Sequence, residues 1–186
     1  MQRTRIPSVA EVYRGWDDHR EKLVRAIAPL DDAQLDLSAA PPLWSVRMLV
    51  SHVIATRAWW FHFFLGEGGP EFERYAHSWL DESGSERYAS WDDFEETASL
   101  EETARRTALQ LVQGLEETGS LLASCLERWT AAELDAELKR PIPNAAGERP
   151  VRKRQWIVWH VAEHDVHHGG EISLTLGMHG LQGLDL

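Results

Sequence analysis

The sequence contains a single cysteine, Cys125, so an internal disulfide and a metal site built from several thiolates are both excluded. It also lacks a long unbroken apolar run. The most apolar stretch, residues 43–65, is interrupted by two arginines and two histidines, whereas a membrane-spanning helix needs about 20 nearly uninterrupted apolar residues. The first 15 residues lack the apolar centre of a signal peptide. We therefore expect a soluble cytoplasmic protein with no membrane partner.

Positive charge is scarce. Lysine and arginine total 19 against 30 aspartates and glutamates, which gives the 186 residues a formal net charge of −11. A surface of this sign repels phosphate backbones, so binding to nucleic acid is disfavoured. Apolar residues make up 43% of the chain, enough for a core without disulfides. We expect residues 1–186 to form one acidic domain.

Strand patterns are missing as well, since no alternating apolar and polar run is bounded by hairpin turns. Helical periodicity recurs in four places, with helices expected to begin near residues 8, 45, 99 and 151. Capping boxes open at Ser8 and Ser99, and Thr130 is expected to cap a short extra helix. Long connections cover residues 66–90 and 139–150. The prediction is an all-α four-helix bundle with long crossover connections.

Histidine is concentrated at the end of the chain, where five of nine fall in the last 27 residues. His164 and His168 lie one helical turn apart on an apolar stripe, so both should point into the core. On the second helix His52 lies within an apolar run, where an unpaired polar group is costly. Two histidines at i and i+4 plus a third from a facing helix give three neutral nitrogen ligands. That set leaves one position open for water or substrate and predicts a catalytic metal site.

Alternatives to this ligand set remain. A lone inward histidine is usually a hydrogen-bonded core residue, but three on two helices favour a metal. His160 is the main competitor of His168, because it has the same spacing from His164. We prefer His168 because Gly169–Gly170 after it should leave room for a substrate. Residues 160–164 also match the H-x-x-E-H signature of one zinc protease group, but only 22 residues remain for its further acidic ligand, so the match is taken as accidental.

Other residues near these histidines are candidates for supporting roles. Glu171 lies close in angle to His164 and is the candidate catalytic base; alternatively it holds a ligand's free ring nitrogen or binds substrate. Asp165 either holds a ligand's free ring nitrogen or lies at the surface. Trp59 packs in the core or walls the metal pocket. The cations within residues 149–154 are unfavourable at a helix N-terminus; they are offset by solvent and carboxylates, or they attract an anionic substrate.

Two segments carry a resemblance to a known family. Residues 43–61, LWSVRMLVSHVIATRAWWF, and residues 159–181, WHVAEHDVHHGGEISLTLGMHGL, resemble the second and last helices of the DinB-like (YfiT-like) superfamily. The resemblance implies a four-helix bundle, a homodimer, and a divalent metal, zinc or nickel, held by His52, His164 and His168.

The resemblance also implies an activity. Relatives are thiol-dependent transferases or isomerases that use a low-molecular-weight thiol, or metal-dependent hydrolases. We accordingly predict a metal-dependent enzyme, a thiol-dependent S-transferase or a hydrolase, acting on a small-molecule substrate. The alternative is a bundle that binds a metal or small ligand without catalysis. Aromatic residues between residues 72 and 91 agree with the expected homodimer, because they can supply a buried interface.

Overall fold

The computed structural model describes residues 7–76, 106–142 and 147–185. Four long helices dominate these ranges: α2 (Arg14–Ile27), α4 (Val46–Ala58), α6 (Ala108–Arg128) and α8 (Arg154–Met178). The shorter helices are α1 (Val9–Val12), α3 (Asp32–Leu35), α7 (Ala131–Leu134) and the 3₁₀ helix η2 (Pro70–Arg74). The described ranges contain no strand. The predicted all-α bundle is confirmed.

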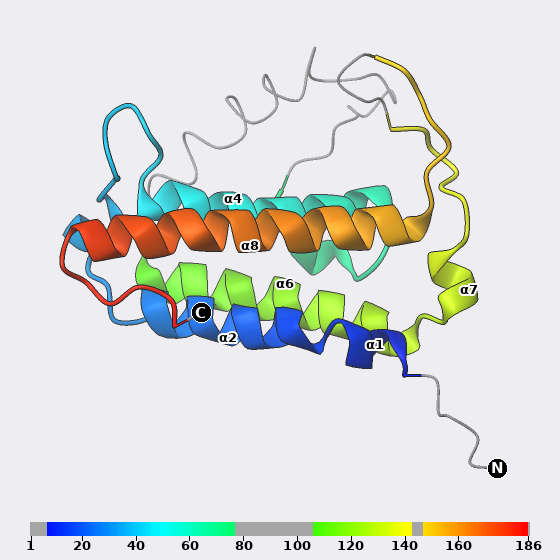
Figure 1. Ribbon diagram of the computed structural model, residues 1–186, viewed down its shortest axis with the longest axis horizontal. Coiled ribbons are helices and arrows are strands. Elements are labelled where there is room, and N and C mark those ends of the chain that lie inside the picture. The colour runs from blue at the N-terminus through cyan, green and yellow to red at the C-terminus, as the bar shows by residue number, and fades with distance from the viewer. Residues whose placement is uncertain (1–6, 77–105, 143–146, 186) are drawn as a thin grey trace.

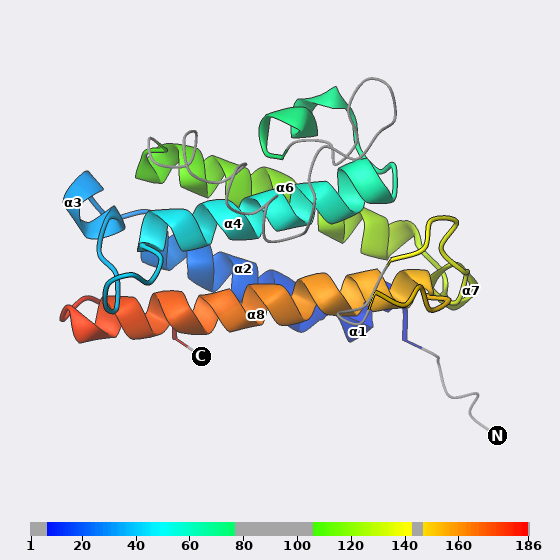
Figure 2. The same cartoon turned by 90° about the horizontal axis from the view of Figure 1, so that it is seen from above.

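The four long helices pack side by side (Figures 1 and 2). α2 and α8 run in one direction, while α4 and α6 run in the other. The parallel neighbours α4 and α6 are joined through residues 65–107, a connection long enough to return the chain to the end where α4 begins. α4 and α8 are antiparallel neighbours, and this pair carries the histidines of interest.

Side-chain caps explain where several helices begin. Ser8 and Glu11 form the predicted capping box of α1, and Thr130 caps α7 as predicted. Ser45 caps α4 by accepting a hydrogen bond from the backbone N–H of Met48 at 3.3 Å. α6 begins behind a capping box at residue 107. The predicted box at residue 99 and most of the aromatic segment at 72–91 lie outside the described residues, so the homodimer stays a prediction.

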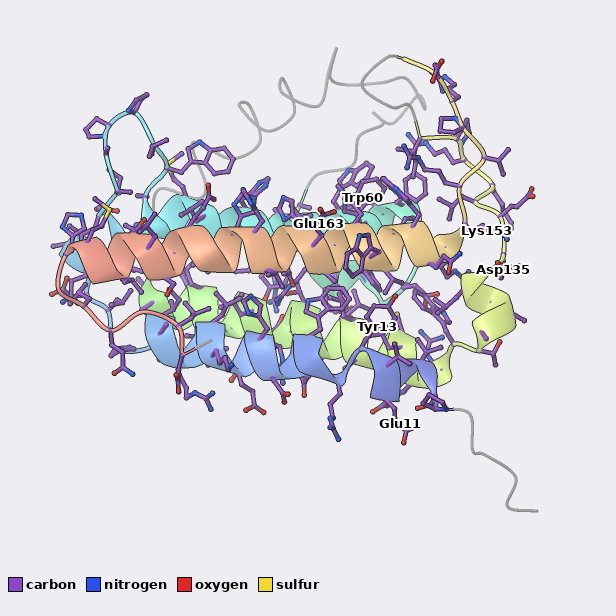
Figure 3. The ribbon with its side chains drawn as sticks, viewed as in Figure 1. Glu11, Tyr13, Trp60, Asp135, Lys153 and Glu163 are labelled. Carbon is purple, nitrogen blue, oxygen red and sulfur yellow. The ribbon has the colours of Figure 1, made fainter. Side chains whose placement is uncertain are left out.

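Each of the four predicted helices differs from the observed one in detail, and α6 begins at Ala108 rather than near residue 99. The first is interrupted at Tyr13, labelled in Figure 3, whose φ of −97° and ψ of 12° separate α1 from α2. The second ends in a wider π-helical turn, η1 (Trp59–Phe64). Residues 59–61 are consecutive buried aromatics, and such a triplet spans about 200° of a regular helix. The wider turn accommodates all three rings in the core.

The last helix begins three residues later than predicted. The N–H of Leu138 donates to the carbonyl of Arg152 at 2.8 Å, and the N–H of Arg154 donates to the carbonyl of Ala136 at 3.0 Å. This pairing holds the backbone extended up to Lys153, so α8 starts only at Arg154. In the described part of the chain, no helix combines the length and apolarity that crossing a membrane requires.

Candidate metal centre

Three histidine rings converge between α4 and α8. The Nε2 atom of His164 lies 2.8 Å from Nε2 of His52 and 3.2 Å from Nε2 of His168. The candidate ligand nitrogens of the three residues all lie within 4.8 Å of one another. Two nitrogens bound to one tetrahedral zinc ion are about 3.3 Å apart, given Zn–N distances near 2.05 Å. The cluster can therefore hold one metal ion.

The helices explain this convergence. α4 is buried almost all round, so His52 points into the bundle and is only 7% exposed. His164 and His168 lie one turn apart on α8, which places both rings on the face that meets α4. The residues that the sequence predicts as ligands are thus brought together by the antiparallel helix pair.

Burial keeps the three rings uncharged. It lowers the pKa of His52 to about 3 and that of His164 to about 2, and the neighbouring histidines contribute to both shifts. The pKa of His168 is also lowered by burial, against an opposing contribution from Glu171. Near neutral pH all three are neutral imidazoles, the form whose nitrogen lone pair binds a metal.

Glu171 is attached to this cluster from outside. Its Oε2 atom lies 2.6 Å from Nδ1 of His168, and its Oε1 atom lies 3.6 Å from Nε2 of His167. When Nδ1 of His168 carries the proton and donates a hydrogen bond to this carboxylate, Nε2 presents its lone pair to the cluster. Carboxylate partners of this kind orient metal-binding histidines. Glu171 therefore fixes the tautomer and the ring orientation of His168.

Trp44 forms one wall of the cluster, which the sequence interpretation missed. Its ring packs edge-on against His52, with centroids 4.9 Å apart, and nearly parallel to His168 at 6.3 Å. Trp59, the predicted wall residue, has ring contacts to Trp60 and Phe64. Two hydrogen bonds fix the loop that carries Trp44. The backbone N–H of Val46 donates to the carbonyl of Leu37, and the ring Nε2 of His179 lies within hydrogen-bond distance of the carbonyl of Ser38. The position of Trp44 directly before the Ser45 cap could have indicated that it lies near the N-terminal turns of α4.

His160, the competing ligand, lies outside the cluster. Its ring stacks on Trp156 at 4.8 Å and meets the edge of Trp60 at 5.2 Å. Its centroid is 6.3 Å from that of His164, whereas the centroid of His168 is 4.3 Å from it. The arrangement favours His168.

Asp165 is not a surface residue but the centre of a buried polar cluster. It is fully buried, and its Oδ2 atom accepts hydrogen bonds from Trp16 Nε1 at 2.5 Å and from Arg57 Nε at 2.8 Å. The side chain of Arg57 is 1% exposed, and its Nη2 atom lies 2.7 Å from the same oxygen. The ion pair ties α8 to α4, and the hydrogen bond from Trp16 ties α8 to α2, directly beside His164. The position of Arg57 within an apolar helix was the signal that could have revealed it, because a buried charge needs a partner.

Gly169 serves packing rather than substrate access. A Cβ atom at this position would lie 2.5 Å from Cε1 of His19. The Nε2 atom of the buried His19 lies 3.0 Å from the carbonyl oxygen of Asp165, within hydrogen-bond distance. The space expected for a substrate is thus filled by a side chain of α2. A Cβ at Gly170 meets nothing within 4 Å.

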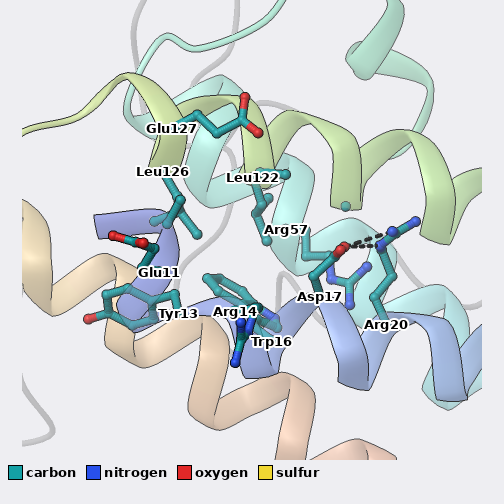
Figure 4. A pocket seen from close by; sticks show the side chains of 13 residues that line it. Glu11, Tyr13, Arg14, Trp16, Asp17, Arg20, Arg57, Leu122, Leu126 and Glu127 are labelled. Atoms are coloured by element: carbon teal, nitrogen blue, oxygen red, sulfur yellow. Dashed lines mark hydrogen bonds and ion pairs between the residues drawn. The ribbon is translucent and has the colours of Figure 1, made fainter. Parts of the chain in front are cut away.

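Two cavities lined by described residues flank the bundle. One of about 380 Å³ adjoins the cluster at His168 and Glu171. The other, of about 280 Å³, contains Trp16 and Arg57 in its lining but none of the three histidines (Figure 4). Asp17 and Arg20 also line this second cavity, and the carboxylate of Asp17 pairs with the guanidinium of Arg20 at 2.7 Å. Of these two, the first cavity is the one that adjoins the cluster.

The basic run before α8 has local partners. The guanidinium carbon of Arg152 lies 3.9 Å from the ring centroid of Trp156, and that of Arg154 lies 4.7 Å from the ring centroid of Trp129, the C-cap of α6. Lys153 pairs with Asp135 at 2.6 Å (Figure 3). At 1.5 Å per residue, the start of α8 lies about 15 Å along the helix from the cluster. Aromatic rings and a carboxylate offset these three cations, which are thus engaged locally.

Solved structures share this fold. A DinB-like protein from Bacillus cereus matches with a TM-score of 0.60 and 14% identity, over 93% of each chain. A conserved protein from Enterococcus faecalis matches with a TM-score of 0.60 and 16% identity, over 92% of this chain and 99% of that one. A mycothiol-dependent maleylpyruvate isomerase matches with a TM-score of 0.55 and 14% identity, over 88% of this chain but 60% of that one.

Among curated proteins, none matches this chain significantly in sequence. The sequence model of the DinB family, in contrast, matches residues 1–183. That span includes both helices of the histidine cluster and the loop that carries Trp44. The chain belongs to the DinB family.

Proposed function

We propose that this protein binds one divalent metal ion, zinc or nickel, through His52, His164 and His168, and acts as a metal-dependent enzyme on a small molecule. The observation that carries the proposal is the convergence of three neutral imidazoles, with Nε2–Nε2 distances of 2.8 and 3.2 Å. Three protein ligands leave a position open for a further molecule, as in catalytic zinc sites.

A thiol-dependent transferase or isomerase is the leading form of this proposal. The mycothiol-dependent isomerase of the same fold supports it. A bound divalent ion would lower the pKa of a thiol or of a water molecule in the open position. A hydrolase is therefore the second form of the proposal, and a bundle that binds a metal or ligand without catalysis is the alternative.

The residues around the cluster have separate roles in this proposal. His52 enters from α4 and joins two ligands on the rigid α8. Glu171, predicted as the catalytic residue, accepts a hydrogen bond from Nδ1–H of His168, so we assign it a positioning role. The ring of Trp44 excludes water from one side of the two histidines that it contacts.

The test is metal analysis of protein purified without a histidine tag, followed by thiol titration of the metal-loaded form. We expect about one equivalent of zinc or nickel per chain. With cobalt(II) in the site, we expect an added low-molecular-weight thiol to produce a thiolate-to-cobalt absorption band. Metal at one equivalent with neither thiol binding nor turnover of an electrophile or ester would support the non-catalytic alternative. Failure to retain any divalent ion would refute the proposal.

Removing the carboxylate of Glu171 should weaken metal binding without abolishing it. For Glu171→Ala we expect metal affinity to fall about 10–100-fold, the usual effect of losing a residue that orients a ligand. Glu171→Gln should lose less metal affinity, since the amide oxygen can still accept a hydrogen bond from Nδ1–H of His168. Competition with a chromophoric chelator measures both.

Glu163→Ala is the matched control for these variants, because Glu163 is exposed on the same helix and lies outside the cluster (Figure 3). It should bind metal as the wild type does. Equal affinities for Glu171→Ala and Glu163→Ala would remove the positioning role.

A further inference from the structure

The cavity of about 380 Å³ beside His168 has an apolar character that extends to the protein surface. Leu43 and Leu174 line it and are 61% and 60% exposed, unusually high fractions for leucine side chains. The remaining lining is also largely apolar, and it includes Ala39, Pro42, Trp44, Leu49 and Thr175. Exposed apolar side chains that gather at a cavity are typical of a ligand-binding site.

The polar groups of this lining are few and already engaged. The hydroxyl of Thr175 donates to the carbonyl of Glu171 at 2.8 Å. The carboxylate of Glu171 accepts from His168. Among the described lining residues, Glu171 is the one with a formal charge, and no lysine or arginine is present. A carboxylate or phosphate in this cavity would find no lysine or arginine among these described residues and would face the like charge of Glu171.

We infer that this cavity takes the uncharged, apolar part of the molecule on which the protein acts, such as a short alkyl chain or an aromatic ring. This inference rests on the proposed function, because it places that apolar part beside the metal centre. Trp44 contributes aromatic surface to the lining, and Leu43 and Leu174 contribute apolar surface from two segments, the loop before α4 and the helix α8. A volume of about 380 Å³ lies at the small end of ligand pockets, which suits one ring or a chain of a few carbons.

Ligand-observed NMR with benzyl alcohol and benzoate tests this inference, because the two probes share a ring and differ in charge. The full-length protein is kept in EDTA, so that benzoate cannot bind a metal ion. We expect benzyl alcohol to bind at least about tenfold more tightly than benzoate. Leu174→Ser should weaken benzyl alcohol several-fold. Val166→Ser is the matched control, since Val166 is 58% exposed on the same helix but does not line the cavity.

Each outcome decides between the inference and its alternatives. The inference would be overturned if benzoate bound as tightly as benzyl alcohol, or if neither probe bound at millimolar concentration. It would also be overturned if Leu174→Ser and Val166→Ser had equal effects on the binding of benzyl alcohol. A separate titration with zinc or cobalt tests the proposed function. Metal binding with no preference between the probes refutes this inference alone, whereas probe preference without metal binding refutes the proposed function alone.

Discussion

Replacing Asp165 with alanine is expected to destabilise the protein by about 3–5 kcal/mol, the range for breaking a buried ion pair from one side. The side chain of Arg57 is only 1% exposed, and its Nη2 atom lies 2.7 Å from Oδ2 of Asp165. The variant removes this carboxylate and leaves the guanidinium buried without it. It also leaves the indole N–H of Trp16 without its acceptor. Urea denaturation of the metal-free protein measures the change in the free energy of unfolding.

A second variant separates the lost attraction from the orphaned charge. In Arg57→Met combined with Asp165→Ala neither charge remains, so the double variant should lose less stability than the sum of the single variants. Glu21→Ala is the control, because Glu21 and Arg25 form an exposed ion pair with side chains 56% and 67% exposed. Pairs of this kind contribute at most about 1 kcal/mol. A loss below about 1 kcal/mol for Asp165→Ala would contradict the structural importance of the buried pair.

The helices and the three histidines could be predicted because they depend on local sequence. An apolar stripe at helical spacing places His164 and His168 on one face of α8. The apolar neighbours of His52 indicate that its helix is buried. Caps at Ser8 and Thr130 mark helix starts through contacts three residues apart. Each of these inferences needs only the geometry of one helix.

The buried cluster around Asp165 could not be predicted in the same way. Its bonds to Trp16 and Arg57 join residues 149 and 108 positions apart. Asp165 follows directly after His164, and helical phase alone does not decide whether that position faces water or a third helix. The packing of α2 against α8 decides it. The role of Gly169 depends on the same packing, since its missing Cβ admits the ring of His19.

Loop residues form the other group that sequence periodicity could not place. Trp44 and Leu43 precede the cap of α4, and their positions depend on a contact from a distant part of the chain, in which the side-chain Nε2 of His179 lies 2.9 Å from the carbonyl oxygen of Ser38. Without that docking, nothing in the sequence indicates that this loop lies beside His168. The wall of the candidate site and its cavity therefore follow from tertiary structure, while the candidate ligands follow from helix geometry.

Replacing His164 with alanine should abolish metal binding. His164 is central, because its Nε2 atom lies within 3.2 Å of the Nε2 atoms of both His52 and His168. Its loss leaves two imidazoles on separate helices. The expected fall in affinity exceeds the roughly 10–100-fold cost of removing an orienting partner. Metal content after dialysis and competition with a chromophoric chelator measure the loss, and circular dichroism checks that the bundle still folds.

The same measurement on neighbouring histidines identifies the ligand set. His52→Ala and His168→Ala should each lose metal nearly as completely as His164→Ala. His160→Phe should retain it, because phenylalanine preserves the ring that stacks on Trp156 at 4.8 Å while removing both nitrogens. Retention of metal in His168→Ala with loss in His160→Phe would move the site one helical turn toward the start of α8. The centroid distances of 4.3 Å from His164 to His168 and 6.3 Å to His160 lead us to expect the opposite result.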